Sequence, residues 1–329
     1  MPLPSGKVNP YELAEIVFPY LELEDERVLV GPDVGLDASV IDCGEKVLVF
    51  SSDPITGAIK DPGWLSVHVN ANDVATIGAA PRWFLINLFL PEGVDRSQIR
   101  NIMKRANDAC RDLDVSIVGG HTEVTPGLDR VLISGAMAGE APADGWVSAA
   151  QAKPGDRLLF TKSAAVEGTF ILALDRGEEL EREYGPDLVD RAESFREKLS
   201  VVPDALTAIE TGGVHAMHDP TEGGLAGGLH ELADASQVGF SIDSEKIPVA
   251  EETRKICNYF EIDPIRTIGS GSLLICVNPE KCEEVIDSLE GAGIGVSNIG
   301  SVLKNKEKRV IDGKTLEFPE QDELWKIFE

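Results

Sequence analysis

The sequence predicts two domains that each mix α-helices with β-strands, in the α/β (α+β) class. A chain of 329 residues is longer than one hydrophobic core usually supports. The first half follows the order β-β-β-α-β-α-β-β, and helices alternate with strands after the turn Lys153-Pro154-Gly155-Asp156. We therefore predict domains at residues 1–152 and 153–329, the second being a smaller α/β sandwich.

Residue spacing defines the elements of the first half. Asn9-Pro10 is typical of a helix start, and apolar residues recur at helical intervals over 62–77 and 95–113. Runs rich in β-branched and aromatic residues, bounded by turn residues, predict strands. The predicted strands are 27–30, 38–42, 46–50, 83–90, 115–118 and 130–138.

The second half alternates the two kinds of pattern. The acidic run 178–183 is typical of a solvated face, and we assign it no element. The predicted helices are 166–175, 187–198, 204–210, 222–234 and 279–289, and the predicted strands are 157–161, 239–243, 272–277 and 295–299.

Composition excludes several classes of partner. The chain carries 57 acidic and 30 basic residues, a formal charge of -27, so it repels nucleic acid and anionic membranes. An anionic ligand needs metal ions and backbone amides to bind such a chain. The five cysteines have neither disulfide-framework nor metal-site spacing, and no apolar run reaches signal-peptide or membrane-span length. We expect a cytoplasmic protein.

Two aspartates lie beside predicted strands. Asp37 precedes one in a turn that contains glycines, and Asp53 follows another in a turn that contains proline. Asp37 lies in the segment 31–39, where glycines permit close approach of a ligand, and Asp53 follows the strand 46–50. Carboxylates at such positions are hard oxygen ligands suited to Mg²⁺. Aspartate is also a common turn residue, so a purely structural role stays open for both.

Asn72 and Asp73 lie inside a predicted helix, where both residue types are unfavourable because they compete for backbone hydrogen bonds. A local rule broken in this way often marks a functional site. A buried polar network with a structural role is the alternative.

The segment 119–123 follows the predicted strand 115–118. Gly119 and Gly120 could hold a phosphate with backbone amides, while His121, Thr122 and Glu123 offer a proton carrier, a hydroxyl and a metal-binding carboxylate. A glycine pair alone is a weak signal, however.

The segment 218–224 opens a predicted helix, with Asp219 or Thr221 placed as its cap. A helix N-terminus favours anions, although capping without a ligand is the commoner use of these residue types. The sequence has no nucleophile elbow, Walker-type phosphate loop, dinucleotide-binding glycine motif or zincin motif. Nucleophilic and zinc hydrolase functions therefore have no support, and His68, His215 and His230 are interpreted as structural or surface residues.

Together, these segments resemble the superfamily that contains aminoimidazole ribonucleotide synthetase, selenophosphate synthetase, thiamine-monophosphate kinase and the hydrogenase maturation protein HypE. Their order and spacing match over almost the whole chain, and HypE is the most similar of the four. The matching stretches are LDASVI at 36–41, SD at 52–53, VNANDVATIGA at 69–79, GGHT at 119–122, KPGD at 153–156 and DPTEGG at 219–224.

The resemblance implies ATP and Mg²⁺ as ligands. Two N-terminal domains would pair into a β-barrel and form a homodimer, with the nucleotide near their seam. Asp219 would approach from the C-terminal domain and, with His121, is a candidate catalytic residue. The expected metal ligands are Asp37, Asp53, Asp73 and Glu123, and the expected nucleotide-binding residues are Asp37, Asp53, Asn72, Asp73, Gly119, Gly120, Thr122 and Thr221.

Departures from the resemblance narrow the function. HypE-type enzymes end in a cysteine, whereas this chain ends in the segment 324–329 and its nearest cysteine is Cys282, so we expect no dehydration on its own terminus. Lys7 lacks the neighbouring reactive cysteine of selenophosphate synthetases, and His121 stands where thiamine-phosphate kinases place aspartate.

The leading hypothesis is an enzyme that uses ATP and Mg²⁺ to phosphorylate or activate an oxygen of a small molecule or carboxamide. A non-catalytic ATP-binding scaffold or sensor and a hydrogenase-maturation-like accessory protein are alternatives, as is a phosphotransferase acting on a partner protein. The acceptor is not specified, because substrate loops vary freely on one fold.

Overall fold

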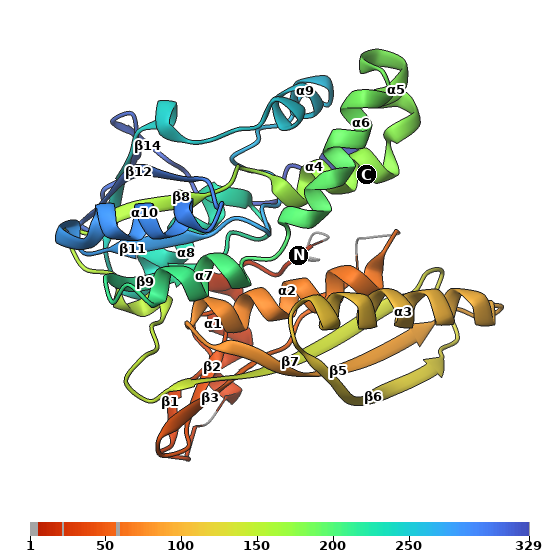
Figure 1. Cartoon of the computed structure of the whole chain (residues 1–329), viewed down its shortest axis with the longest axis horizontal. Coiled ribbons are helices and arrows are strands. Elements are labelled where there is room, and N and C mark those ends of the chain that lie inside the picture. Colours follow the sequence, from red (N-terminus) through yellow and green to blue (C-terminus); the bar gives the residue numbers. More distant parts are fainter. Residues whose placement is uncertain (1–5, 22, 57–59, 329) are drawn as a thin grey trace.

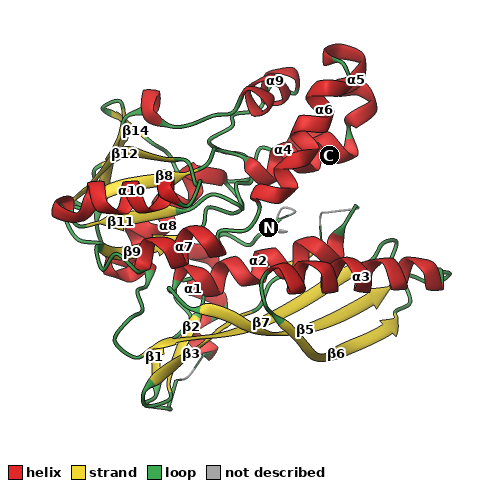
Figure 2. Ribbon diagram, viewed as in Figure 1, coloured by secondary structure: helices red, strands yellow, loops and turns green. Residues whose placement is uncertain are grey.

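The computed structural model describes residues 6–21, 23–56 and 60–328. The first five residues, which belong to the N-terminal segment expected to lack a signal peptide, lie outside the described residues. Two seven-stranded mixed sheets, each with its own helices, form the molecule (Figure 1, Figure 2). The mixed α/β class predicted from the sequence is confirmed. Of the helices in the described residues, none is long and apolar enough to span a membrane.

The first sheet has the strand order β1-β2-β3-β7-β5-β6, and β4 pairs with β7. Its pairings are antiparallel except that of β5 with β6, which is parallel. Burial alternates along β5 and β7, so one face of the sheet packs against the core. The strands are β1 Val28–Val30, β2 Ser39–Asp42, β3 Lys46–Ser51, β4 Pro54–Ile55, β5 Ala80–Leu90, β6 Ser116–Val124 and β7 Leu132–Pro142.

Two helices, α2 Pro62–Thr76 and α3 Arg96–Asp112, cover one face of this sheet (Figure 1). Asp95 starts α3 with a capping box, in which its side chain accepts the Ser97 amide while Gln98 accepts the Asp95 amide. Before the sheet come α1 Pro10–Ile16, capped by Asn9 as its Asn-Pro start predicts, and the short helix η1 Phe18–Tyr20.

The second sheet has the order β14-β13-β10-β12-β8-β11-β9. All of its pairings are antiparallel except that of β10 with β13. The strands are β8 Arg157–Thr161, β9 Val214–His218, β10 Gly239–Ile242, β11 Leu274–Val277, β12 Val296–Leu303, β13 Arg309–Ile311 and β14 Lys314–Thr315.

Helices pack on both faces of the second sheet. Leu158 and Phe160 of β8 share a core with α8, whereas Leu159 between them belongs to the core of α7 and α10. The α-helices are α4 Val166–Asp175, α5 Gly177–Tyr184, α6 Pro186–Glu193, α7 Val202–Ile209, α8 Gly224–Ser236, α9 Glu251–Tyr259, α10 Cys282–Gly291 and α11 Trp325–Phe328. The short 3-10 helices are η2 Ala149–Gln151, η3 Ser194–Lys198, η4 Ser244–Lys246 and η5 Pro279–Lys281.

A continuous core joins the domains, because α2 of the first packs against α7 and β9 of the second. Asn72 fixes this contact: its amide donates to the Leu199 carbonyl and accepts from the Val201 amide, both at 2.8 Å. This bonding explains why a buried asparagine is tolerated inside α2, and it is the structural network that the sequence left as the alternative.

Several predicted boundaries were wrong. Strand β6 extends to Val124 instead of ending at Val118, because Gly119–Glu123 pair in parallel with β5. The acidic run 178–183 belongs to the helix α5, which buries Leu180 under a charged face. The strand β9 and the helix α9 were not predicted.

His68 is a buried histidine at the domain contact. The centroid of its ring lies 4.6 Å from that of the Trp64 ring. The guanidinium groups of Arg105 and Arg196 lie over the same Trp64 ring, 5.1 and 4.7 Å from its centroid. Neither ring nitrogen has a hydrogen-bond partner in the described part of the chain. Burial first, then the positive charges of Arg196 and Lys162, lower the pKa of His68 to about 3.

His68 should therefore make stability depend on pH. The unfolded chain protonates this histidine near its ordinary pKa of 6.5 and the folded chain only near 3, so stability falls as pH falls through that window. Urea unfolding of His68→Leu at about pH 5 and pH 7.5 should show the variant gaining about 2 kcal/mol on the wild type at the lower pH. The control His121→Leu removes an exposed histidine and should leave the difference unchanged; equal pH slopes in wild type and His68→Leu would contradict this assignment.

Candidate functional site

Four aspartates from separate segments meet where the two domains join. Asp37 lies just before β2, Asp53 just after β3 and Asp73 inside α2, and Asp219 follows β9 in the second domain. The charges of Asp53, Asp219 and Asp37 all act on Asp73. Segments of both domains thus contribute to one acidic cluster, which we define as Asp37, Asp53, Asp73 and Asp219.

Three carboxyls of the acidic cluster, those of Asp53, Asp73 and Asp219, have raised pKa values. Burial is the largest cause for Asp73, and the nearby charge of Asp53 adds to it, so the pKa of Asp73 lies well above its ordinary value. Burial and the charge of Asp37 raise the pKa of Asp219 to about 8, and burial also raises the pKa of Asp53. A cation bound among these carboxyls would offset the cost of ionising them in the interior.

Neighbouring polar groups hold these carboxylates in place. Ser51, the last residue of β3, donates a hydrogen bond to Asp73. Asn70, one turn earlier on α2 than Asp73, accepts the backbone amide of Asp53 at 2.8 Å and donates to the Asp53 carbonyl at 3.2 Å. The polar residues inside α2 therefore position the loop after β3 as well as supplying Asp73.

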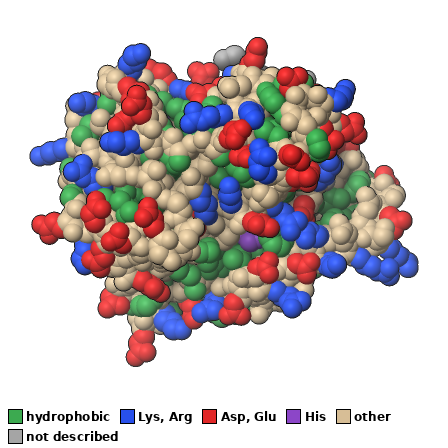
Figure 3. Space-filling view, turned by 45° about the horizontal axis from the view of Figure 1, so that its top comes forward, with side chains coloured by type: hydrophobic (Ala, Val, Ile, Leu, Met, Phe, Trp, Pro, Cys, Tyr) green, Lys and Arg blue, Asp and Glu red, His purple; other side chains and the backbone are tan. Residues whose placement is uncertain are grey.

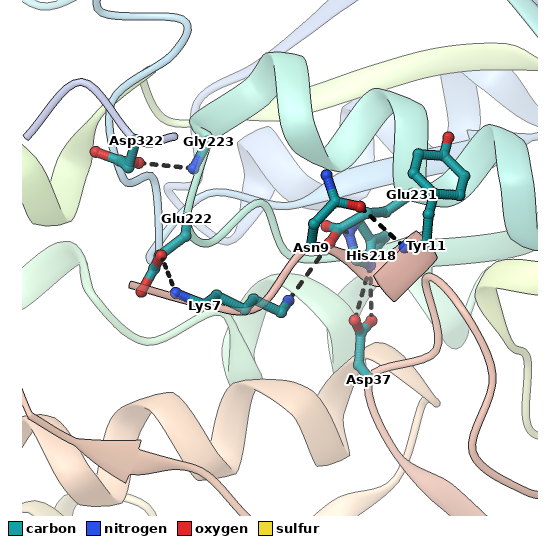
Figure 4. Close-up of polar contacts among 9 residues, drawn as sticks. All are labelled: Lys7, Asn9, Tyr11, Asp37, His218, Glu222, Gly223, Glu231 and Asp322. Atoms are coloured by element: carbon teal, nitrogen blue, oxygen red, sulfur yellow. Dashed lines mark hydrogen bonds and ion pairs between the residues drawn. The ribbon is translucent and has the colours of Figure 1, made fainter. Parts of the chain in front are cut away.

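His218, the last residue of β9, links the domains through the site. Its Nδ1 lies 2.8 Å from an Asp37 oxygen and its Nε2 lies 3.1 Å from Glu231 of α8 (Figure 4). Burial would lower the pKa of His218, but Asp37 and Glu231 outweigh it and raise the pKa to about 10. At neutral pH the imidazolium therefore donates to both carboxylates.

Lys7 reaches the same place from the N-terminal segment. Its Nζ lies 3.4 Å from Glu231 and its backbone amide donates to Glu222 at 2.8 Å (Figure 4). The Glu231 charge raises the pKa of Lys7 above its ordinary value. Burial opposes ionisation of Glu231, but Lys7 and His218 lower its pKa to about 2.

Sequence reasoning missed the roles of Lys7, His218 and Glu231. Lys7 lacks the reactive cysteine neighbour of selenophosphate synthetases, so its sequence context predicts no role for it. Glu231 lies thirteen residues from His218 along the chain, and only the packing of α8 against the end of β9 brings the two side chains together. The adjacency of His218 to Asp219 was the one signal that the sequence offered.

The acidic cluster fits a divalent cation in its donor chemistry. Both oxygens of the Asp219 carboxyl are buried and lack a hydrogen-bond partner among the described residues. Buried carboxylate oxygens without partners are hard ligands that Mg²⁺ prefers. As the side chains stand, the described residues contain no group of three His, Cys, Asp or Glu side chains already arranged around a metal.

The cap predicted for α8 was wrong. Gly223 is the N-cap, in a left-handed conformation with φ 80°, and neither Asp219 nor Thr221 provides a side-chain cap. Instead, Asp322 from the end of the chain accepts the Gly223 amide at 2.6 Å (Figure 4). The Thr221 carbonyl accepts the amides of Gly224 and Gly269, so this residue shapes the turn.

The segment Gly119–Glu123 is placed apart from the acidic cluster. It lies within β6, at the edge of the first sheet, and its side chains are exposed (Figure 1). The His121 ring contacts Glu123 at 3.2 Å, and Thr125 donates to Glu123 at 2.8 Å. Within one copy of the chain, the structure does not bring Gly119, Gly120, Thr122 or Glu123 to the aspartates. Asn72 points toward the second domain.

Comparison with known proteins agrees with this architecture. Residues 35–141 match the family model of the AIR synthase related protein N-terminal domain, and residues 153–313 match that of the C-terminal domain. A putative hydrogenase expression/formation protein of Methanocaldococcus jannaschii is 28% identical over 94% of this chain and 91% of its own length. Carbamoyl dehydratase HypE of Azotobacter vinelandii is 31% identical over 76% of this chain and 72% of its own length.

A solved structure extends the similarity to three dimensions. The hydrogenase maturation protein HypE in complex with ATP superposes with a TM-score of 0.72 at 26% identity, covering 97% of each chain. The two family models together span most of the sequence and include all four aspartates of the acidic cluster. The chain therefore belongs to the AIR synthase related family, within which it is HypE-like.

Proposed function

We propose that this protein is an ATP- and Mg²⁺-dependent enzyme that phosphorylates or activates an oxygen of a small molecule or carboxamide. The observation that carries the proposal is the convergence of Asp37, Asp53, Asp73 and Asp219 at the domain junction. The reported complex of a HypE protein with ATP supports the nucleotide part. The name carbamoyl dehydratase, given to relatives, supports chemistry at a carboxamide oxygen.

The acidic cluster would hold Mg²⁺ through its carboxylate oxygens. A bound Mg²⁺ neutralises phosphate charge and orients the nucleotide. The residues around it have positioning roles: His218 holds Asp37, Ser51 holds Asp73 and Asn70 holds the loop of Asp53. Lys7 adds a positive charge beside Asp37 and Asp53, where it can also attract phosphate oxygens.

We also propose that the protein acts as a cytoplasmic homodimer through the uncovered face of the first sheet. The helices α2 and α3 lie on the opposite face, leaving the outer face open in Figure 1. Phe50, Trp83 and Leu85 are exposed by 42%, 40% and 45%, and Phe50 and Trp83 both pair with Ala138. Contiguous apolar side chains on a sheet face favour association.

Dimerisation would also offer a role for the segment Gly119–Glu123. Gly119–Glu123 lie on β6 beside this open face, at the sheet edge. A second copy could bring its Gly120 backbone and its Thr122 or Glu123 side chains toward the acidic cluster of the first. This arrangement is part of the proposal and would account for predicted nucleotide-binding residues that lie apart in one chain.

Asp219→Asn should weaken binding of Mg²⁺-ATP by at least about tenfold, because it removes a buried carboxylate from the cation site. Wild type at a hundred times Kd should gain about 2.7 kcal/mol of stability, and a thermal-shift titration measures the difference. Without ligand, the variant should be at least as stable as wild type. The Asp219 carboxyl, with its pKa near 8, is already mostly neutral at pH 7, so replacing it with a neutral amide removes no stabilising charge.

The matched control is Asp129→Asn, which removes an equal charge from a side chain that is 92% exposed. It should leave the titration unchanged. Equal losses in the two variants, or wild type that gains no stability from Mg²⁺-ATP, would argue against a nucleotide at the acidic cluster. Release of ADP with metabolite pools as acceptors then separates an enzyme from an ATP-binding scaffold, which would bind without turnover.

Leu85→Asp should convert a dimer to a monomer, because it places a charge in the apolar face of the sheet. Size-exclusion chromatography with light scattering should give wild type twice the chain mass of 35.4 kDa and the variant the chain mass itself. Tyr259→Asp, at an exposed aromatic residue on α9 of the second domain, is the control and should remain dimeric. A wild type that elutes as a monomer at every concentration would rule out this interface.

A further inference from the structure

A pocket of about 940 Å³ lies in the second domain, away from the four aspartates of the acidic cluster. Three segments enclose it: the end of β8 with Lys162 and Ser163, the end of η3 with Lys198, and the loop from η4 to the start of α9. The turn 293–298, which leads into β12, closes the fourth side. A pocket of this size accommodates a small organic molecule.

The charge of this pocket is opposite to that of the chain. Four basic residues line it, Lys162, Lys198, Lys246 and Arg254, against the two acidic residues Glu197 and Glu245. The whole chain has 30 basic and 57 acidic residues. Figure 3 shows Lys and Arg side chains also gathered near the middle of one face of the molecule. A local excess of positive charge on so acidic a protein favours an anionic ligand.

Two of the four cations remain available to a ligand. Within the described residues, neither Lys198 nor Arg254 has a carboxylate within ion-pair distance. The Lys198 ammonium lies over the Phe195 ring, 3.8 Å from its centroid, a contact that involves no carboxylate. The Arg254 guanidinium uses Nε alone, on the Val249 carbonyl at 3.2 Å. Lys246 instead pairs with Asp243 at 3.1 Å. An arginine whose terminal nitrogens are free offers paired donors that match the oxygens of a phosphate.

Lys162 has a structural role in the wall of the pocket. Its Nζ donates to the carbonyls of Ser200 and Gly271 at 2.6 and 2.8 Å and lies 2.9 Å from Asp204. It also donates to the Lys198 carbonyl at 3.2 Å, which fixes the segment that carries the Lys198 side chain. Lys162 adopts a left-handed φ of 57°, an unfavourable conformation for a residue with a side chain, and such strain persists where the surroundings enforce it.

The first turn of α9 adds to the positive potential. Ala250 is its N-cap, lines the pocket and supplies no side-chain cap. The two glutamates of this turn are engaged elsewhere, since Glu251 pairs with Lys255 at 2.7 Å and Glu252 with Arg191 at 2.6 Å. Neither carboxylate therefore occupies the place of a ligand beside Arg254.

Part of the wall is apolar. Ile247, Pro248, Val249 and Ile294 line the pocket beside the charged groups. A ligand that fills this space would have an anionic group near Lys198 and Arg254 and an organic body against these side chains. An inorganic ion alone would leave the apolar wall without a partner.

We propose that this pocket is a second ligand site, which binds a small organic phosphate through Lys198 and Arg254. The phosphate lies between the two cations, and the organic part packs against Ile247, Val249 and Ile294. The inference does not rest on the proposed nucleotide site, because the two share no lining residue.

Phenyl phosphate is the probe, with inorganic phosphate for comparison, in titration calorimetry without divalent metal. Phenyl phosphate should bind about tenfold more tightly than inorganic phosphate, because its ring buries apolar surface. Lys198→Gln and Arg254→Gln should each weaken its binding about tenfold. The control Lys304→Gln removes an equal charge from an exposed position outside the pocket and should change binding less than about twofold.

Asp219→Asn separates the two sites. Phenyl phosphate binding that survives this substitution and weakens in Lys198→Gln and Arg254→Gln supports the second site. Binding abolished by Asp219→Asn, unaltered by both pocket substitutions, or undetectable in wild type would overturn it. Thermal unfolding of each variant checks that it is folded, which both exposed positions favour.

Discussion

The imidazolium of His218 between Asp37 and Glu231 is the interaction on which the site depends. Its ring nitrogens lie 2.8 Å from Asp37, in a loop of the first domain, and 3.1 Å from Glu231, on a helix of the second. The three side chains are at most 10% exposed. Leaving either carboxylate without this partner would strand a charge in the interior. Asp37 and Glu231 carry two negative charges, whereas the His218 imidazolium carries one positive charge. The ammonium of Lys7 supplies the second, so together the two cations balance Asp37 and Glu231.

The rest of the cluster is balanced differently. Among the described residues, no ion pair joins Asp53, Asp73 or Asp219 to a cation, and although the charge of Lys7 acts on Asp53 and Asp219, burial raises the pKa values of all three. In the proposed function, Asp53, Asp73 and Asp219 would be the part of the site that binds the metal ion, while His218 and Lys7 balance Asp37 and Glu231. Burying carboxylates costs free energy, and the chain already has a net charge of -27. Ligand binding at this buried group would explain why it is there.

Much of the architecture could be predicted because α3 and the long strands β5 and β7 alternate buried and exposed residues at regular intervals, whereas α2, β8 and β11 are buried on nearly every side and can be predicted from their apolar residues. The aspartates could be singled out because Asp73 breaks helix preferences and Asp53 follows a strand. What could not be predicted depends on long-range contacts: Asn72 is explained only by Leu199 and Val201, and the amide of Gly223, the N-cap of α8, donates to Asp322 from the far end of the chain. The segment Gly119–Glu123 continues a strand only because β5 lies beside it, a partner that no local pattern reveals.

The most direct test of the central claim is a crystal structure with Mn²⁺ and a non-hydrolysable ATP analogue, in which anomalous scattering locates the metal. If the acidic cluster holds the metal, a manganese peak should be bound by oxygens of at least two of Asp37, Asp53, Asp73 and Asp219, with the triphosphate beside it. A nucleotide bound in another part of the molecule, with these four carboxylates unoccupied, would contradict it.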